Sequence, residues 1–323
     1  MTITTAITRL FGIEHPILLA PMGSIAGGAL AAAVTRAGGL GIIGGGYGDR
    51  THLENEFAAA GNTAVGVGFI TWSLAKQPQL LDLALERAPK ALFLSFGELA
   101  PFADKIKRAN VPLIAQVQTV DQAKRALADG ADVLVAQGTE AGGHGATRAT
   151  FPLVPAVVDV AGKVPVLAAG GIADGRGLAA ALMLGAAGVV CGSAFYASAE
   201  STAHPNAKAA TVAGSGDNTE RGTSVDVVRG IEWPAQWNIR TLRNSFIDRW
   251  SRDPAGLQAN IETERSRFLA ARDAGDMNVA AVIVGEGIDL VREVEPAGEI
   301  VRKMVAAAET RIAKASDLLS ANS

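Results

Sequence analysis

Short apolar runs alternate with longer amphipathic segments through the first two thirds of the chain. Eight of these runs are four to six residues long and almost continuous in apolar side chains, and most of them are followed by glycine, proline or a polar residue. Such runs are typical of parallel strands that are buried on both faces. The predicted strands are Ile17–Ala20, Leu40–Ile43, Ala64–Phe69, Ala91–Leu94, Pro112–Ala115, Val133–Ala136, Val164–Ala168 and Gly188–Cys191.

The segments between these runs are rich in alanine and carry apolar residues at helical spacing. Strands that alternate with helices over short connections predict parallel βα units. Eight strands are the number that closes a (β/α)8 barrel, so this TIM-like α/β fold is the prediction, with a doubly wound open sheet as the alternative. Helices are expected over about residues 28–37, 52–60, 80–88, 99–109, 120–128, 153–161 and 177–185.

The pattern changes after about residue 200, where charged residues become more frequent and three tryptophans appear. We interpret this part as a small, mainly helical lobe inserted at the barrel mouth, with a helical segment over about 241–271. Trp233, Trp237 and Trp250 would form the core of the lobe itself, and the alternative is that they line a substrate channel.

Apolar residues return over 279–284, and we expect this stretch to belong to the barrel again. The amphipathic segment 297–319 predicts a last helix on the outside of the barrel. The expected domains are a barrel over 1–213, an inserted lid lobe over 214–275, and a return to the barrel with the C-terminal helix over 276–323.

Composition narrows the class of protein. Of the 323 residues 49% are hydrophobic, and the formal net charge of −3 gives no basic excess for nucleic acid. The one cysteine, Cys191, lies in an apolar run and is expected in the core, and a chain that cannot form an internal disulfide fits a cytoplasmic protein. We find no signal peptide and no apolar stretch of about 18 residues, so no membrane segment is expected. The oligomeric state stays open, with a homodimer among the alternatives.

The candidate chemistry centres on the stretch from Val133 to Gly145. A buried strand stops at Gln137, and a glycine-rich loop then brings Glu140, Gly142 and His144 close together. A titratable imidazole at the end of a barrel strand is where such an enzyme would hold a base. The alternative is a loop histidine that only caps a turn, and this stretch alone does not separate the two.

Glycine-rich turns follow the seventh and eighth predicted strands. Gly170 and Gly171 open the loop before the seventh helix, and Gly192 and Ser193 follow the eighth strand. Loops seven and eight of a barrel often bind phosphate through backbone N–H groups, so we expect a phosphorylated ligand or cofactor here. Asp174 is expected to cap the seventh helix, because a carboxylate would repel phosphate.

Other motifs are absent or misplaced. Residues 39–44 match G-x-G-x-x-G, but they overlap a predicted strand and open no helix, so a dinucleotide fold is not indicated. The chain has no G-x-S-x-G elbow, no Walker loop and no HExxH, and its four histidines suggest no metal site.

Several stretches resemble the nitronate monooxygenases, formerly called 2-nitropropane dioxygenases. The resemblance spans most of the chain, and the Q-G-x-E-A-G-G-H block is its most specific part, although related flavin-dependent enoyl reductases and NAD(P)H:quinone reductases share it. The segments that carry it are Ala20–Met22, Gln137–Gly145, Pro165–Asp174, Gly192–Ser193, Arg229–Pro234 and Gly285–Ile288.

The resemblance implies a TIM-like barrel that holds one FMN non-covalently beneath a small lid. Position by position, it implies that His144 is the catalytic base for neutral nitroalkanes, or helps to bind the charge of a nitronate. The products would be a carbonyl compound and nitrite, with O2 as co-substrate. The implied flavin contacts are Met22, Gly68, Gln137 and Gly142, and the implied phosphate contacts are Gly170, Gly171, Gly192 and Ser193.

Three positions depart from the family pattern. Gly68 stands where asparagine is frequent, Glu286 where glutamine is frequent, and Ser193 where threonine is common. We interpret Glu286 as part of a solvated turn, the alternative being a second acid–base group. The competing functions are an NAD(P)H-dependent flavin reductase for quinones or enoyl thioesters, a non-catalytic flavin-binding protein, and a flavin-free barrel enzyme acting on phosphosugars.

Overall fold

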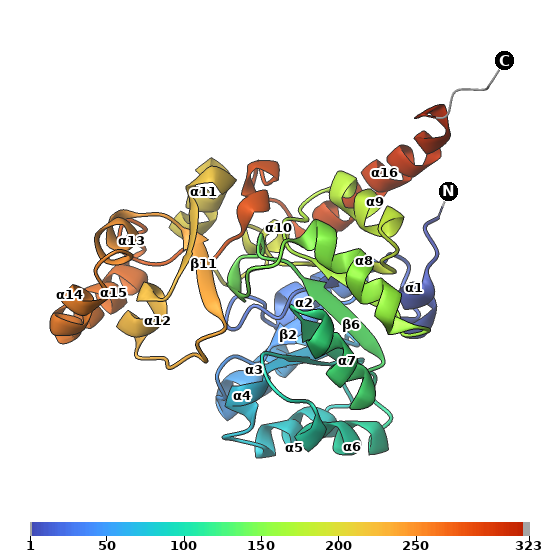
Figure 1. Cartoon of the computed structure of the whole chain (residues 1–323), viewed down its shortest axis with the longest axis horizontal. Coiled ribbons are helices and arrows are strands. Elements are labelled where there is room, and N and C mark those ends of the chain that lie inside the picture. Colours follow the sequence, from blue (N-terminus) through green and yellow to red (C-terminus); the bar gives the residue numbers. More distant parts are fainter. Residues whose placement is uncertain (1, 319–323) are drawn as a thin grey trace.

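The computed structural model describes residues 2–318 and contains eight parallel strands in a nearly closed barrel (Figure 1). The order in the sheet is β1-β9-β8-β6-β5-β4-β3-β2, and a bridge between Leu18 and Leu40 joins its two ends. The predicted barrel is therefore confirmed, and the open sheet is not. The strands are β1 (Ile17–Leu19), β2 (Ile42–Gly44), β3 (Gly66–Ile70), β4 (Leu92–Ser95), β5 (Leu113–Val117), β6 (Val133–Gln137), β8 (Val166–Ala169) and β9 (Gly188–Cys191).

Helices cover the outside of the barrel close to the predicted positions. These are α2 (Gly28–Arg36), α3 (Arg50–Ala60), α5 (Gln79–Glu86), α6 (Ala100–Arg108), α7 (Val120–Ala128), α8 (Thr150–Ala161) and α9 (Gly175–Met183). The predicted cap is also confirmed, because the Asp174 carboxylate accepts from the backbone N–H groups of Arg176 and Gly177. Four further helices are not predicted from the sequence. Three are only four to six residues long, α1 (Ala6–Phe11), α4 (Thr71–Leu74) and α10 (Ser193–Tyr196), and α11 (Pro205–Ala213) has nine residues but little helical periodicity.

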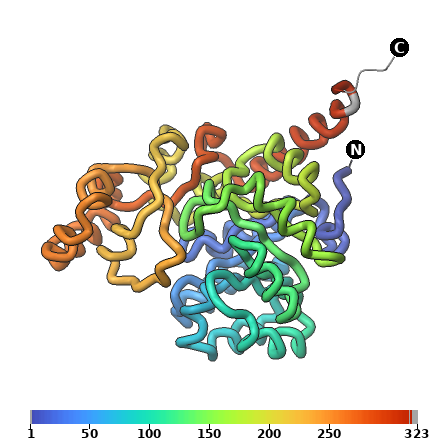
Figure 2. The backbone as a smooth tube through the Cα atoms, in the orientation of Figure 1, coloured from blue at the N-terminus to red at the C-terminus, as the bar shows by residue number. Residues whose placement is uncertain are grey.

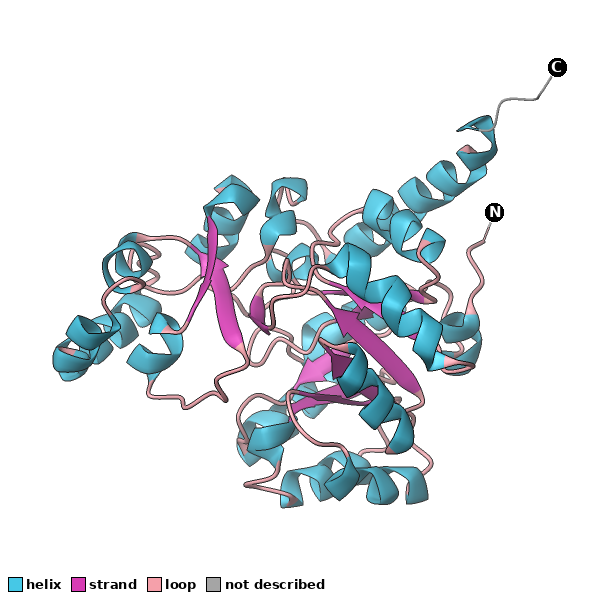
Figure 3. Cartoon of the chain, in the orientation of Figure 1, coloured by secondary structure: helices cyan, strands magenta, loops and turns pink. Residues whose placement is uncertain are grey.

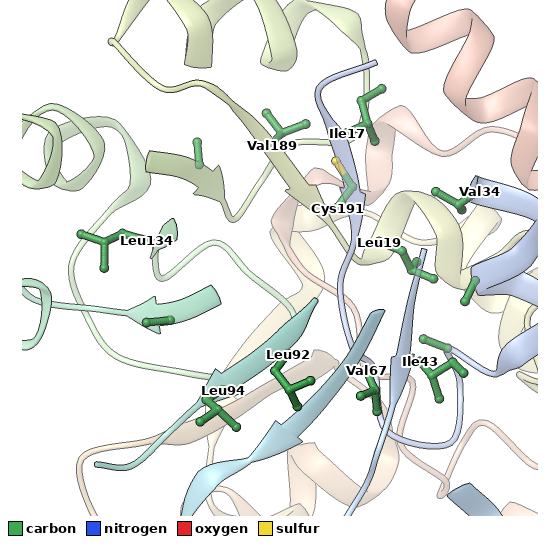
Figure 4. Close-up of a cluster of buried hydrophobic side chains, with 14 of the residues drawn as sticks. Ile17, Leu19, Val34, Ile43, Val67, Leu92, Leu94, Leu134, Val189 and Cys191 are labelled. Carbon is green, nitrogen blue, oxygen red and sulfur yellow. The ribbon is translucent and has the colours of Figure 1, made fainter. Parts of the chain in front are cut away.

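The barrel has two apolar cores because successive strand residues face opposite sides of the sheet. Leu18 points into the barrel interior, which Ile7 and Phe11 of α1 close at one end. Ile17 and Leu19 point outward to the helices, in the cluster that Figure 4 shows. Cys191 belongs to this outer core, where burial raises the pKa of its thiol to about 12, so the predicted core position is confirmed.

The lobe contains more strand than predicted. Besides α12 (Ser224–Arg229), α13 (Ser245–Trp250), α14 (Pro254–Ala259) and α15 (Ile261–Ala274), it has β10 (Thr219–Gly222) and β11 (Asn238–Leu242). Both join β7 (Gly143–Gly145) in an antiparallel sheet (Figure 3). The predicted helical segment 241–271 is thus wrong at its start, because pairing with strands distant in sequence overrides the local pattern.

The chain returns from the lobe as an irregular segment (Figure 2). Residues 279–284 form no barrel strand, which corrects the prediction: Val279 and Ala280 pack in the lobe core, while Val282 and Val284 join a separate small cluster. A 3-10 turn, η2 (Glu286–Leu290), precedes α16 (Ala297–Ala313) and η3 (Ala315–Leu318). The helix α16 contacts α9 and α2, as an outer helix would. Leu319, the predicted helix end, lies outside the described residues, and the exact domain boundaries stay a prediction.

Candidate active site

A cavity of about 820 Å³ lies at the carboxyl ends of the barrel strands and is lined by both barrel and lobe. Barrel topology gathers loops from strands distant in sequence at this face, and the cavity size is that of small-molecule sites. Every site residue predicted from the sequence lines it: Met22, Gly68, Gln137, Gly142, His144, Gly170, Gly171, Gly192 and Ser193.

Several of these glycines occupy positions that admit no side chain. A Cβ at Gly68 would lie 2.5 Å from Pro21, and a Cβ at Gly142 would lie 2.4 Å from the carbonyl carbon of Val284. Gly170 has a φ of +106°, and its Cβ would lie 2.7 Å from Thr150 Oγ1. The backbone itself therefore forms much of the cavity wall.

The wall after β8 and β9 suits a phosphate group. Gly170 and Gly171 both have positive φ and turn the chain at the strand end. Among the described residues, nothing accepts a hydrogen bond from the amides of Gly171 and Gly192. Ser193 Oγ accepts from the amide of Gly285 at 2.9 Å, which leaves the hydroxyl proton available to a ligand. These groups form a neutral set of donors of the kind that binds phosphate.

The side chain of Gln137 is held in place by the barrel. Its Oε1 accepts from Gln116 Nε2 at 3.1 Å and from Gln118 Nε2 at 2.9 Å. Its Nε2 donates to the His144 carbonyl at 3.1 Å, which leaves one amide N–H for a ligand in the cavity. Barrel topology also predicts Gln116 at this face from the sequence alone, and Gln116 does line the cavity, whereas the sequence gives no signal for Gln118.

His144 lies on β7 and is almost fully buried at the cavity wall. Its Nε2 lies 2.9 Å from Oδ2 of Asp226 on α12, and no described residue forms a hydrogen bond with Nδ1. Burial lowers the pKa of His144; the Asp226 hydrogen bond and charge oppose this shift, and the charges of Arg229 and Arg221 add to it. The lowered pKa favours the uncharged imidazole at neutral pH, and the contact with Asp226 places its proton on Nε2 and leaves the lone pair of Nδ1 free.

Trp233 stacks on one face of the His144 imidazole. The two rings are nearly parallel, with 3.4 Å between centroids and 9° between planes. The indole Nε1 of Trp233 donates to the hydroxyl of Tyr47 at 3.0 Å, and Phe96 packs edge-on against the indole. Trp233 therefore links the lobe to the barrel loop that follows β2.

The expected role of the tryptophans holds for only one of the three. Trp250 belongs to the lobe core, as predicted. Trp233 lines the cavity, and Trp237 is buried outside that core with its Nε1 3.2 Å from Gln118 Oε1. Trp233 and Trp237 lie in the segment that leads into β11. Because β11 pairs with β7, the strand of His144, this segment runs along the barrel mouth and not into the lobe core.

Two arginines of the lobe sheet hold the loop that joins Gln137 to His144. Arg221 donates to the carbonyls of Thr139 at 2.9 Å and Ala141 at 2.8 Å, and burial lowers its pKa to about 10. Arg240 donates to the Thr139 carbonyl at 3.0 Å and pairs with Glu286 at 2.8 Å. The Glu286 carboxylate is partly exposed and does not line the cavity, which supports a turn rather than an acid–base group.

Within residues 2–318 no group of three histidine, cysteine, aspartate or glutamate side chains is placed to hold a metal ion. None of the described helices combines the length and apolar character needed to cross a bilayer. A cytoplasmic location and a homodimer stay predictions.

Comparison with known proteins identifies the family. A family model described as nitronate monooxygenase matches residues 4–82 and 74–307. A nitronate monooxygenase of Neurospora crassa is 32% identical over 350 residues, covering 93% of this chain and 91% of the relative.

Solved structures agree with the fold. The structure of FabK from Thermotoga maritima has a TM-score of 0.84 at 30% identity, over 98% of this chain and 100% of that one. The nitroalkane oxidase of Streptomyces ansochromogenes has a TM-score of 0.79 at 28% identity, over 96% and 99%. With the family model matched across nearly the whole chain, this protein belongs to the nitronate monooxygenase family and is an oxidoreductase.

Proposed function

We propose that the protein is an FMN-dependent nitronate monooxygenase. It would convert alkyl nitronates, and neutral nitroalkanes after deprotonation, with O2 into carbonyl compounds and nitrite. The observation that carries this proposal is the His144 imidazole buried at the cavity wall, with Nδ1 free and Nε2 held by Asp226.

The residues around the cavity fit FMN. Met22, Gly68, Gln137 and Gly142 would contact the isoalloxazine ring, with Gln137 offering its remaining amide N–H. The donors of Gly170, Gly171, Gly192 and Ser193 would hold the phosphate. The two carboxylates near them are already engaged, Asp174 as a helix cap and Glu140 as an acceptor for Thr150. When bound, the cofactor supplies the redox chemistry, taking electrons from the nitronate and delivering them to O2.

His144 would act on neutral nitroalkanes as a general base. Nδ1 accepts the proton from the carbon next to the nitro group, and the resulting imidazolium is stabilised through its Nε2–H by the Asp226 carboxylate. Trp233 covers one face of the imidazole, which limits its orientation and excludes water from that side. A preformed nitronate has already lost this proton, so it needs only to be bound.

The alternative function is a flavin reductase that takes hydride from NAD(P)H and reduces a quinone or an enoyl thioester. One observation favours it: the part of the cavity under the lobe is apolar, and a small nitronate would not fill it. The residues concerned are Ile239, Phe268, Leu269, Met277 and Ile283. In this case His144 would donate a proton to the reduced substrate.

An anaerobic experiment separates the two functions. FMN-loaded protein is mixed with propyl-1-nitronate, and separately with NADPH or NADH, while the flavin absorbance is followed. The proposal expects bleaching by the nitronate, then reoxidation with release of nitrite when O2 is admitted. Rapid bleaching by the nicotinamide with an inert nitronate would contradict it and support the reductase.

A further inference from the structure

Arg229 stands beside the His144–Asp226 pair and faces the same cavity. It is the last residue of α12, and its guanidinium lies over the Tyr47 ring, 5.5 Å from the ring centroid. The nearest carboxylate oxygen is Asp226 Oδ1, 3.9 Å from Nη1, which is beyond hydrogen-bonding distance. No other carboxylate in the described chain comes within 4.0 Å of it.

The other arginines near the site are already engaged. Arg221 and Arg240 are bound to the carbonyl groups of Thr139 and Ala141 in the loop before His144. Arg272 also lines the cavity, but its side chain is 62% exposed and pairs with Asp273 at 2.9 Å. Arg229 is thus the guanidinium, among residues 2–318, that reaches the cavity next to His144 with no hydrogen bond to a carboxylate, since its ion pair with Asp226 is 3.9 Å long.

The proposed substrate needs such a cation. A nitronate carries its negative charge over two oxygens of a planar group, and the burial that lowers the pKa of His144 disfavours the imidazolium that could compensate this charge. A guanidinium presents parallel N–H groups that match a planar two-oxygen anion in a bidentate way. Aromatic rings of Tyr47 and Trp233 border this position and would exclude water from the contact.

We infer that Arg229 binds the anionic head group of the substrate and makes the site selective for small planar anions with two oxygens, nitronates and carboxylates. The identification of the substrate as a nitronate rests on the proposed function, whereas the binding of a two-oxygen anion by Arg229 does not. The competing explanation is that Arg229 only balances the charge of Asp226, in which case its removal would leave anion binding unchanged.

The test measures binding and not turnover. FMN-loaded protein is titrated with butanoate, which resembles propyl-1-nitronate in shape and charge, and with the neutral butanamide, by calorimetry. The variants are Arg229→Gln, which removes the charge, and Arg229→Lys, which keeps the charge but loses the planar fork. Arg249→Gln is the matched control, because Arg249 also lies 3.9 Å from a buried carboxylate, that of Glu264, and over an aromatic ring, that of Trp250, but away from the cavity.

Loss of Arg229 is expected to weaken butanoate binding about 10- to 100-fold, the usual effect of losing a charge-assisted contact. Arg229→Lys should lie between Arg229→Gln and the native protein, while Arg249→Gln and the affinity for butanamide should not change. Native affinity for butanoate in Arg229→Gln, or no binding of butanoate to the native protein, would overturn the inference. If butanoate binding depends on Arg229 but the nitronate does not reduce the flavin, the proposed function fails and the anion site stands.

Discussion

Nε2 of His144 lies 2.9 Å from Oδ2 of Asp226, although the two residues are 82 positions apart in the chain. The imidazole comes from a barrel loop and the carboxylate from the lobe, so the pair exists only when the lobe is docked on the barrel. Asp226 Oδ1 is buried, has no hydrogen-bond partner in the described chain and lies 3.9 Å from Arg229 Nη1, so the hydrogen bond of this carboxylate goes to His144.

Replacing His144 by alanine should separate the two substrate forms. Turnover of neutral nitroalkanes is expected to fall roughly 10²- to 10⁴-fold, the usual contribution of a general base. Turnover of preformed nitronates should fall much less, because no proton has to be removed. Steady-state nitrite release with 1-nitropropane and with its nitronate checks this, and equal losses on both would refute the base role.

The pH dependence should follow the imidazole. Because burial lowers the pKa of His144 from 6.5, the neutral base is present at pH 7 and is lost only as the pH falls through this lowered value. We expect kcat/KM for a neutral nitroalkane to be constant near neutrality and to decline on an acid limb with an apparent pKa below 6.5. A limb centred above 6.5 would argue against His144 as the base.

Asp226→Asn should weaken the base while leaving the fold in place. The carboxylate raises the pKa of His144 against the effect of burial, so its loss should move the acid limb to still lower pH. The imidazolium would also lose its counter-charge, and kcat for neutral nitroalkanes should fall by about 10- to 100-fold. Asp248→Asn, at an exposed lobe carboxylate, is the control. An unshifted acid limb in Asp226→Asn would contradict the proposed coupling.

Trp233→Ala should have the opposite effect on the pKa. Removing the stacked indole exposes the imidazole to water, which reduces the effect of burial that lowers its pKa. The acid limb should therefore shift upward, toward 6.5. Trp233→Phe keeps an aromatic ring over His144 but loses the hydrogen bond to Tyr47, so it should retain a limb close to that of the native protein. The pH profiles of kcat/KM for both variants test this, and an unshifted acid limb in Trp233→Ala would contradict it.

Gly170→Ala should impair cofactor binding. The residue has a φ of +106° and its Cβ would clash with Thr150 Oγ1, so the turn that presents the phosphate donors must shift. We expect at least about tenfold weaker FMN affinity and a stability loss of about 1–3 kcal/mol. Gly162→Ala provides the control, since Gly162 also has a positive φ, of +62°, but has open space around it and lies away from the cavity. Equal FMN affinity in both variants would argue against a phosphate site at Gly170.

The barrel is predictable from the sequence because its signal is local. The buried parallel strands are largely apolar runs, as at Val133–Ala136, and several of them end at glycine or proline. Closure then brings every strand end to one face, whatever the distances in sequence. This is why the sequence alone suffices to assign Gln137, Gly171, Gly192 and Ser193 to a common cavity.

The remainder of the site depends on contacts that have no local signal. Asp226 lies in a short helix, and nothing nearby in sequence marks it as the partner of His144. The sequence favours a place for Trp233 in the lobe core because tryptophan is usually buried, yet the pairing of β11 with β7 carries it over the imidazole.

The sequence by itself determined the barrel and the loops that line the cavity, since periodicity and glycine positions are local properties. Only the tertiary structure decided the environment of His144. The charge, the stacking and the burial that set the pKa of this imidazole come from a lobe that docks across the barrel mouth, and no local pattern encodes that contact.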